Sequence, residues 1–380
     1  MVRTERPTPQ RHCRVLDLIN TDKSAKELLE HRVTQVNATG RFANAILCGP
    51  GEYVDQLRAR GLTVHVVDSP RGLSPAAVLR SIWRTFRLLR RERFDVVHTH
   101  GTVIGVIGRV AAWLARTPVV VHQVHGFHHH ANMKATGRWM SIRVERVMAW
   151  LTDELLFQNP ADIETCVASR IAPRRKLTLI GNGIQLDAYG NGTLPSNEPP
   201  IVLAVARFEP VKNHAMLLEA ARRLKERGVV FVLQLAGDGE TRSACEAQVR
   251  EQGLTDVVRF LGYRDDIPAL TAGADVCVLT SIKEGMPRAI LEAAASGRPM
   301  VATDVVGNAD ALADGVAGYL VPLGDASALA DRIAELLADP EKRRTIGRQA
   351  RAHAEAHFDE RTTTERIIEV YDRAGSRRRG

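Results

Sequence analysis

Short apolar runs alternate with amphipathic stretches through the first half of the chain. The apolar runs predict strands at residues 14–19, 45–48, 64–67, 94–98 and 119–123. Apolar positions at helical spacing predict helices over residues 25–36 and 75–91. Strands that alternate with helices are typical of βαβ units, which build a parallel sheet. The first half therefore predicts a doubly wound α/β domain.

This alternation stops at residues 191–200 and then starts again. The segment reads NGTLPSNEPP, and no apolar period runs through it. After it, strands are predicted at 201–206, 230–236, 257–261, 275–279 and 300–303, and helices at 214–227, 241–252 and 288–295; the tail from 327 to 373 is mostly helical. We therefore expect two doubly wound α/β domains facing a cleft. Sheets of this kind bind ligands at the carboxyl ends of their strands.

The length of 380 residues agrees with two domains, at roughly 150 residues each. We expect an N-terminal domain over residues 1–190, a linker over 191–200 and a C-terminal domain over 201–357. The final helix with its basic tail, over 358–380, is expected to cross back to the first domain. The five cysteines are scattered without a CxxC pair, which favours reduced thiols and a cytoplasmic protein. The start is polar without the apolar stretch of a signal peptide, and no apolar run approaches the roughly 18 residues of a spanning helix, so we expect neither secretion nor insertion into a membrane.

The charge balance is basic, with 52 Lys and Arg against 44 Asp and Glu, a formal net charge of +8. Such a balance fits nucleic acid, a membrane surface or an anionic small substrate as the partner. Nucleic acid is disfavoured, because aromatic residues make up only 5% of the chain and no known binding motif appears.

Two carboxylates stand eight residues apart in the segment KEGMPRAILEAAASG at 283–297. Pro287 suits the first helical position, so Glu284 is expected in the preceding loop and Glu292 about a turn and a half inside the helix. The helix dipole and the free N–H groups near residues 285–289 would favour a phosphate there. A capped surface helix with two solvated glutamates fits the same spacing, so the spacing alone leaves both interpretations open.

Two other candidate segments follow predicted strands, and a third, IGNGI, lies near the end of the first domain. The segment ARFEPVKNH at 206–214 places Arg207 and Lys212 where a guanidinium fork and an ammonium group can hold a diphosphate, although an ordinary basic loop is the alternative. The glycine turns AGDGE at 236–240 and IGNGI at 180–184 permit close backbone approach but are weak indications.

Histidines gather in the first half, where seven of the thirteen lie close in sequence: His98, His100, His122, His125, His128, His129 and His130. Zinc is disfavoured, because no HExxH motif or CxxC pair accompanies them and three consecutive histidines cannot turn one face to a metal. His125 is the better site candidate, because it follows a predicted strand whose carboxyl end opens on the cleft.

Taken in order, the segments resemble the retaining glycosyltransferases of family 4, which have the GT-B fold and a Glu-x7-Glu motif. EGMPRAILE at 284–292 is similar to that motif. The resemblance extends over DVVHTHG (95–101), VVVHQVHGF (119–127), FQNPADIE (157–164), LIGNGI (179–184), ARFEPVKNH, AGDGE, LGYRDDIPALTAGADVCVLTS (261–281) and GYLVPLGD (318–325).

The resemblance implies a role for each matching position. Arg207 and Lys212 would hold the diphosphate of a nucleotide sugar, Glu292 the ribose and Glu284 the sugar ring. The remaining assignments are backbone contacts at Gly285, Met286 and Pro287, the sugar-facing His125, the base-side Arg264 and a binding residue at Asn182. It also implies a UDP-hexose or UDP-N-acetylhexosamine donor, no metal or other cofactor, and a lipid-linked saccharide or a natural product as the acceptor.

The chain departs from the family at an N-terminal Gly-Gly turn, which is replaced by the segment NTDKSA at 20–25. Lys23 and Ser24 are candidates to take its place at the donor phosphate. The rival hypotheses are another GT-B activity, such as a sugar-phosphate synthase or an epimerase, and a non-catalytic nucleotide-sugar-binding subunit.

The stretch from Ala77 to Arg93 predicts a strongly amphipathic helix. The apolar stripe consists of Leu79, Ile82, Trp83, Phe86 and Leu89. The basic stripe consists of Arg80, Arg84, Arg87 and Arg91. Basic amphipathic helices can lie on anionic membrane surfaces, here the inner membrane face. We favour a helix whose apolar face packs on its own sheet, and keep membrane contact as the second hypothesis.

Overall fold

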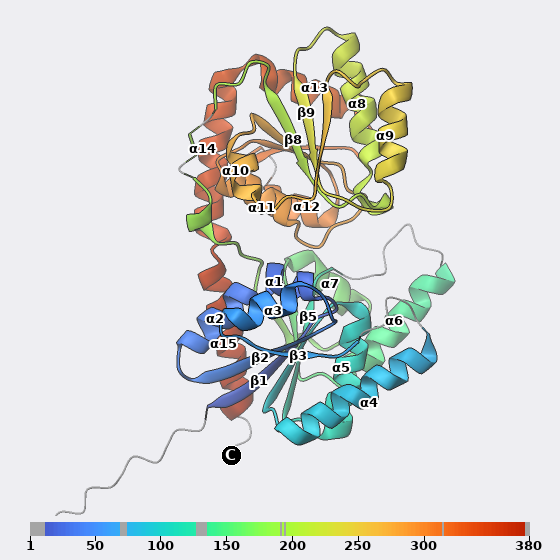
Figure 1. The fold of residues 1–380 in the computed structure, drawn as a ribbon, viewed down its shortest axis with the longest axis vertical. Coiled ribbons are helices and arrows are strands. Elements are labelled where there is room, and N and C mark those ends of the chain that lie inside the picture. Colours follow the sequence, from blue (N-terminus) through green and yellow to red (C-terminus); the bar gives the residue numbers. More distant parts are fainter. Residues whose placement is uncertain are drawn as a thin grey trace, which may run out of the picture. The chain divides into compact units, whose positions relative to one another are not determined.

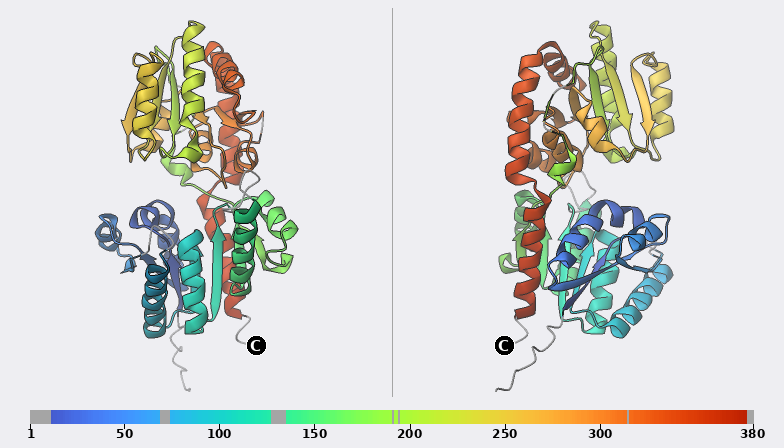
Figure 2. Two further views of the ribbon diagram at one scale, coloured as in Figure 1. Left: turned by 90° about the vertical axis from the view of Figure 1, so that its right-hand side faces the viewer. Right: turned by 60° about the vertical axis from the view of Figure 1, so that its left-hand side comes forward.

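The computed structural model describes residues 12–68, 74–126, 135–190, 192–193, 195–313 and 315–376. The chain forms two compact units, each with its own sheet and helices (Figures 1 and 2). Unit 1 comprises residues 1–157, 163–180 and 364–380, and unit 2 comprises residues 158–162 and 181–363. Among the described residues, no helix is long and apolar enough to cross a membrane.

Unit 1 contains a seven-stranded parallel sheet in the order β3-β2-β1-β4-β5-β6-β7. The strands are β1 (Cys13–Leu18), β2 (Phe42–Cys48), β3 (Thr63–Val66), β4 (Val96–His100), β5 (Val119–Val124), β6 (Glu154–Phe157) and β7 (Leu177–Leu179). The helices are α1 (Asp22–Leu28), α2 (Glu30–Ala38), α3 (Tyr53–Ala59), α4 (Pro75–Glu92), α5 (Thr102–Ala115), α6 (Ala135–Trp150), α7 (Pro160–Ala168) and the last helix α15 (Glu360–Ser376); α7 and α15 both start in unit 2.

Helices cover both faces of this sheet, as a parallel sheet requires. On one face Leu16 and Leu18 of β1 pack with α4 and α5. On the other face Val15 packs with Val36 of α2 and with residues of α15. The last helix therefore contributes to the core of unit 1, in agreement with the expected crossing back.

Unit 2 contains a six-stranded parallel sheet in the order β10-β9-β8-β11-β12-β13. The strands are β8 (Ile201–Val205), β9 (Val232–Ala236), β10 (Val258–Gly262), β11 (Val276–Leu279), β12 (Met300–Thr303) and β13 (Gly318–Val321). The helices are α8 (His214–Glu226), α9 (Arg242–Glu251), α10 (Ile267–Ala272), α11 (Arg288–Ala295), α12 (Val306–Leu312), α13 (Ala326–Ala338) and α14 (Pro340–His357).

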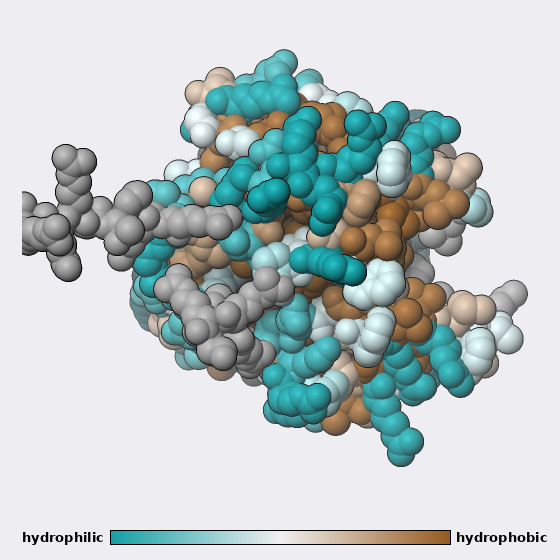
Figure 3. Space-filling model, turned by 90° about the horizontal axis from the view of Figure 1, so that it is seen from below, coloured by the Kyte–Doolittle hydropathy of each residue, from teal (hydrophilic) through white to brown (hydrophobic). Residues whose placement is uncertain are grey.

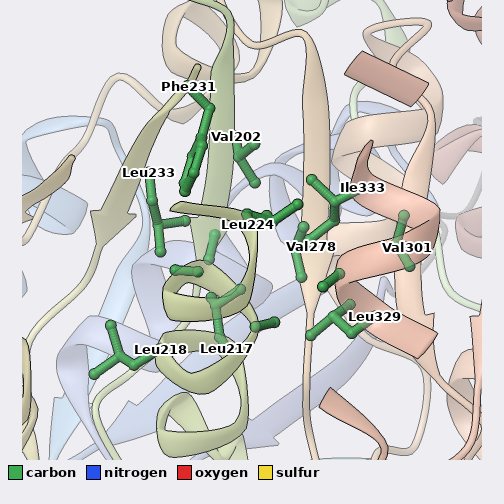
Figure 4. Packing of buried hydrophobic residues seen from close by; sticks show 14 of the residues in the cluster. Val202, Leu217, Leu218, Leu224, Phe231, Leu233, Val278, Val301, Leu329 and Ile333 are labelled. Atoms are coloured by element: carbon green, nitrogen blue, oxygen red, sulfur yellow. The ribbon is translucent and has the colours of Figure 1, made fainter. Parts of the chain in front are cut away.

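Alternate residues of each strand in unit 2 enter two cores. One core packs α8 and α13 on the sheet through Leu217, Leu224, Leu329 and Ile333, with Val278 of β11 beneath them (Figure 4). The other core packs α11, α12 and α14 on the opposite face. Burial of these side chains, at roughly 25 cal/mol per Å² of apolar surface, stabilises the unit and holds the strand ends in place.

Several predicted elements need correction. The helix predicted over 25–36 is interrupted at Leu29, which divides it into α1 and α2. The strand predicted over 94–98 lies at 96–100, so that His98 and His100 are inside β4 and buried. Helix α5 was not predicted, because its sequence TVIGVIGRVAAWLA is apolar on most sides and shows little period.

The favoured hypothesis for the helix from Ala77 to Arg93 holds for part of its apolar stripe, because Ile82 and Phe86 pack, partly buried, against the core of unit 1. Leu89 is buried in the core of unit 1, as expected. Leu79 and Trp83 of the same apolar stripe are 66% and 58% exposed. The stripe therefore continues past the edge of the core into solvent.

Candidate active site

A lysine and a glutamate meet at the carboxyl edge of the sheet in unit 2. Lys212 follows β8 and Glu284 follows β11, and the strand order of this sheet reverses between these two strands. The Lys212 Nζ and Glu284 Oε1 atoms are 2.5 Å apart, and the two side chains are only 18% and 11% exposed. Ligands of doubly wound sheets bind at such a reversal point.

Hydrogen bonds hold the two loops that carry this pair. The Thr280 hydroxyl donates to the carbonyl oxygens of Lys212 and Asn213, at 3.0 and 3.1 Å. The N–H of Ile282 donates to the carbonyl of Val211 at 2.8 Å. The position of Lys212 relative to Glu284 is thus set by the backbone and does not depend on the ion pair alone.

The loop from Gly285 to Pro287 is fixed by two asparagines from distant parts of the chain. Asn159 Nδ2 donates to the carbonyl of Gly285 at 2.9 Å, and Asn182 Nδ2 donates to the carbonyl of Met286 at 3.2 Å. The sequence predicted Pro287 at the first helical position of α11. In the structure Pro287 is the N-cap, and Arg288 takes the first helical position. The N–H of Ile290 already donates to the Pro287 carbonyl, so only the N–H groups before Ile290 are available to bind an anion at this helix start.

Glu292 lies on the second turn of α11 and is largely buried. Its Oε1 atom is 3.5 Å from Nε of Arg288, and its carboxylate lies near the Tyr189 hydroxyl. Burial, followed by the nearby charge of Glu292, raises the pKa of the Tyr189 hydroxyl, which therefore stays protonated. With side chains only 11% and 10% exposed, Glu284 and Glu292 contradict the alternative of two solvated glutamates.

Two other predicted binding residues pair within their own loops. Arg207 follows β8, is 71% exposed and lies 2.7 Å from Glu209. Arg264 follows β10 and makes two hydrogen bonds to Asp266. Both positions lie at the carboxyl edge of the sheet, but their guanidinium groups are engaged with these acidic neighbours.

The glycine turns have a packing explanation. A Cβ atom at Gly237 would lie 2.0 Å from the Ala206 carbonyl oxygen, and one at Gly239 would lie 2.4 Å from that of Phe208. A Cβ atom at Gly183 would lie 2.5 Å from the Cα atom of Glu360. These glycines are needed where two backbones touch, whether or not a ligand is bound.

A buried polar cluster lies at the carboxyl edge of the sheet in unit 1. Asp17 of β1 accepts a hydrogen bond from Arg32 at 2.5 Å and one from Asn44 at 3.0 Å. Nε2 of His100 is 2.9 Å from the same Asp17 carboxylate, and Nδ1 of His100 is 3.3 Å from Nε2 of His125. The strand order reverses between β1 and β4, so this cluster too lies at a reversal point.

This cluster sets the protonation of His125. A carboxylate only accepts hydrogen bonds, so Nε2 of His100 must carry the proton that faces Asp17. Nδ1 of a neutral His100 is then an acceptor, and Nε2 of His125 must donate to it. Burial, together with the charge of Arg32, lowers the pKa of His125 to about 4. His125 is therefore a neutral imidazole with one defined tautomer.

A positively charged side chain already lies where a metal ion would bind in this cluster. Asp17, His98 and His100 bring one ligand atom each within 4.8 Å of one another. However, the Arg32 guanidinium binds the Asp17 carboxylate and lies 3.3 Å from His100, which places a positive charge at this point. His128, His129 and His130 lie outside the described residues.

Two family models match the chain, one in each half. The model described as "Glycosyl transferase 4-like domain" matches residues 27–183, and "Glycosyl transferases group 1" matches residues 191–353. The UDP-Gal:α-D-GlcNAc-diphosphoundecaprenol α-1,3-galactosyltransferase of Escherichia coli is 31% identical over 268 residues, which cover 67% of this chain and 69% of that protein. The chain belongs to the GT4-type glycosyltransferases. A second relative of this glycosyltransferase, the D-inositol 3-phosphate glycosyltransferase of Saccharomonospora viridis, is 32% identical over 78% of this chain and 75% of its own length.

The solved structures agree on the fold. Anabaena HepE, crystallised with UDP and glucose, superimposes with a TM-score of 0.80 at 22% identity, over 95% of this chain and all of that one. This glycosyltransferase therefore has the two-domain GT-B fold, as the sequence predicted.

The segment that replaces the N-terminal Gly-Gly turn is organised by its own side chains. The Thr21 hydroxyl caps α1 by accepting from the N–H of Ser24, and it also bonds the Ser24 hydroxyl at 2.9 Å. The Asp22 carboxylate accepts from the N–H of Tyr53 and fills the space that a side chain at Gly51 would need. In this glycosyltransferase the Ser24 hydroxyl, predicted to lie at the donor phosphate, accepts a hydrogen bond from the hydroxyl that caps α1.

The buried histidines predict acid sensitivity. Burial lowers the pKa of His98, His100 and His122, and that of His125, below the value near 6.5 expected in the unfolded chain. Their contribution to stability is complete above pH 6.5 and is lost as the pH falls towards their folded values, by up to about 1.4 kcal/mol per pH unit for each histidine.

Urea unfolding between pH 7.5 and 5 measures this loss, and His122→Gln should reduce the slope. His12→Gln, a change at an exposed position, is the control and should leave the slope unchanged. A free energy of unfolding that stays constant over this range would contradict the prediction.

Proposed function

We propose that this glycosyltransferase moves a hexosyl or N-acetylhexosaminyl group from a UDP-sugar to a hydroxyl of a lipid-linked saccharide, with retention of anomeric configuration. The observation that carries the proposal is the Lys212–Glu284 pair at the reversal point of unit 2, with Glu292 on the following helix. Lys212 would neutralise the diphosphate, Glu284 would hold the sugar ring and Glu292 the ribose hydroxyls.

Each part of the proposal has a chemical reason. The leaving diphosphate develops negative charge, which Lys212, Arg207 and the start of α11 can stabilise without a metal ion. Arg207 would exchange Glu209 for the phosphate, since its ion pair is exposed and worth little. In unit 1, His125 would present a neutral ring to the sugar. In unit 2, Arg264 would lie on the side of the base.

Relatives support the substrates. The name of the E. coli relative includes a UDP-sugar and a diphosphoundecaprenol-linked acceptor, and HepE binds UDP and glucose in its crystals. We assign donor binding to the C-terminal domain expected over residues 201–357 and acceptor binding to the domain expected over 1–190. The inositol phosphate glycosyltransferase supplies the competing hypothesis, a soluble phosphorylated acceptor.

The proposal is tested with a panel of UDP-, GDP- and ADP-sugars scored by thermal shift, followed by transfer assays. The acceptors are a short-chain polyprenyl diphosphate saccharide and D-inositol 3-phosphate. We expect the largest shift with a UDP-sugar, transfer to the polyprenyl acceptor, and a product whose anomeric configuration by NMR is that of the donor. An inverted product would overturn the retaining assignment, and transfer to inositol phosphate alone would overturn the lipid-linked acceptor.

A further inference from the structure

All four tryptophans of this glycosyltransferase are exposed, and all four lie on three neighbouring helices of unit 1. Their exposed fractions are 58% for Trp83 on α4, 54% for Trp113 on α5, and 55% and 72% for Trp139 and Trp150 on α6. Tryptophan is usually among the most deeply buried side chains. A set of four exposed ones on adjacent elements therefore indicates a contact surface.

Other apolar side chains extend this surface. They come from the same three helices and are all at least 40% exposed: Leu79, Leu114, Met140, Val144 and Val147. We call these residues and the four tryptophans the tryptophan surface. Three residues separate the end of each of these helices from the next strand, so Trp113 and Trp150 lie at the edge where β5 and β6 start. In the view onto this end of unit 1, brown apolar atoms are bordered by teal hydrophilic ones (Figure 3).

The tryptophan surface lies beside a concentration of arginines. Helix α4 and its cap carry six arginines and a single acidic residue, Glu92, which is already paired with Arg14 and Arg91. Within the described part of the chain, Arg80, Arg84, Arg87 and Arg90 form no ion pair. On α6, the Arg143 guanidinium lies 5.0 Å from the ring centre of Trp139. This surface therefore carries positive charge that the described chain does not neutralise.

A hollow on α4 brings several of these arginines together. It has a volume of about 630 Å³ and is lined by Arg84, Phe86, Arg87, Leu88, Arg90 and Arg91. Guanidinium groups bind phosphate oxygens through two parallel N–H donors, and apolar side chains beside them suit the hydrocarbon next to a phosphate. The lining thus matches a phospholipid headgroup and the first part of its acyl chains.

We propose that the tryptophan surface and the arginines of α4 dock this glycosyltransferase on a bilayer that contains anionic phospholipid. Tryptophan rings favour the boundary between headgroups and hydrocarbon, and each arginine close to an anionic surface adds attraction. Charge complementarity identifies an anionic bilayer as the partner, because arginines of α4 that form no ion pair with the described residues lie beside the apolar side chains. This proposal rests on the proposed function for its purpose, because the saccharide of a lipid-linked acceptor lies at the bilayer surface.

Two of the four tryptophans lie at the edge of the sheet away from the buried cluster. Asp17, His100 and His125 lie at the carboxyl edge of the sheet, whereas Trp113 and Trp150 lie at the opposite edge of the same sheet. Contact through the ends of α5 and α6 that carry Trp113 and Trp150 does not cover this cluster. Variants of the tryptophan surface can therefore be tested without changing residues proposed to bind the donor.

The test uses the full chain and two kinds of vesicle, phosphatidylcholine alone and phosphatidylcholine with about a third phosphatidylglycerol. We expect co-sedimentation with the anionic vesicles only, and release in 0.5 M NaCl because salt screens exposed charges. Since every tryptophan of the chain lies on this surface, binding should shift the intrinsic fluorescence to shorter wavelength. The double variant Arg84→Gln/Arg87→Gln should lower the partition coefficient roughly 30-fold, at about fivefold for each arginine.

Controls separate this proposal from the proposed function. Arg344→Gln/Arg348→Gln removes the same charge from α14 of unit 2 and should bind vesicles like the wild type. Vesicle binding is measured without substrates, and Arg84→Gln/Arg87→Gln should keep its activity on a water-soluble acceptor. Equal binding to neutral and anionic vesicles, no binding, or unchanged binding by Arg84→Gln/Arg87→Gln would each overturn the proposal. So would a dimer in solution that Trp83→Ser/Trp150→Ser dissociates, because a second copy would then cover the surface.

Discussion

Replacing Lys212 by methionine should lower kcat/KM by roughly 10- to 150-fold while the protein stays folded. A hydrogen bond to a charged group contributes about 1.5–3 kcal/mol, and each 1.36 kcal/mol corresponds to a factor of ten. Lys212 is the largely buried cation at the reversal point of unit 2, whereas Arg207 is 71% exposed and can be replaced in part by water. Arg207→Met should therefore cause the smaller loss of the two.

Lys225→Met is the matched control for this experiment. Lys225 also pairs with a carboxylate, that of Asp256 at 2.6 Å, but this pair is on the surface of unit 2. The activity of Lys225→Met should equal that of the wild type. The melting temperatures of Lys212→Met, Arg207→Met and Lys225→Met should be compared. Turnover by Lys212→Met within twofold of the wild type would remove Lys212 from the proposed diphosphate site.

Replacing Asp17 by alanine should lower the free energy of unfolding by roughly 3–5 kcal/mol. The change leaves the Arg32 guanidinium buried without its partner, and breaking a buried pair on one side has costs of this order. Urea unfolding at pH 7.5 gives the value. The double variant Asp17→Leu/Arg32→Met removes both charges and should recover much of the loss.

A surface ion pair provides the comparison. Asp55→Ala removes a carboxylate that is 92% exposed and paired with Arg58, and it should change the stability by less than about 1 kcal/mol. A loss below 1 kcal/mol for Asp17→Ala as well would show that the buried cluster is hydrated or neutral. Transfer activity of the double variant then reports on the tautomer of His125, which would no longer be set by Asp17.

The sequence predicted the site best where functional residues lie on short local segments. The loop after β8 and the loop before α11 were both recognisable, because a strand followed by a basic loop and a proline at a helix start are local patterns. The same local reasoning placed Pro287 one residue too far into the helix. It also assigned Arg207 and Arg264 to ligands without the acidic neighbours Glu209 and Asp266 with which they pair.

Residues whose role depends on distant partners were missed. Asp17 lies in an apolar strand, and Arg32 reads as one more charged position of a helix. Only the pairing of β1 with β4 brings Asp17 to His98 and His100. Asn159 belongs to the segment FQNPADIE, but its bond to Gly285 spans 126 residues. The one available signal was a lone aspartate within an otherwise apolar strand, which asks for a buried partner.

The sequence by itself determined the two-domain α/β fold, the family and the loops that carry Lys212, Glu284 and Glu292. These features depend on periodicity and on neighbours within a few residues, which are visible in one dimension. The tertiary structure decided which charges are buried against which, and which members of the stripe on α4 lie against the core. Burial and pairing depend on what packs opposite a side chain, and in a parallel sheet that neighbour comes from a strand tens of residues away. For that reason the polar cluster around Asp17 and the exposed tryptophans became apparent only in three dimensions.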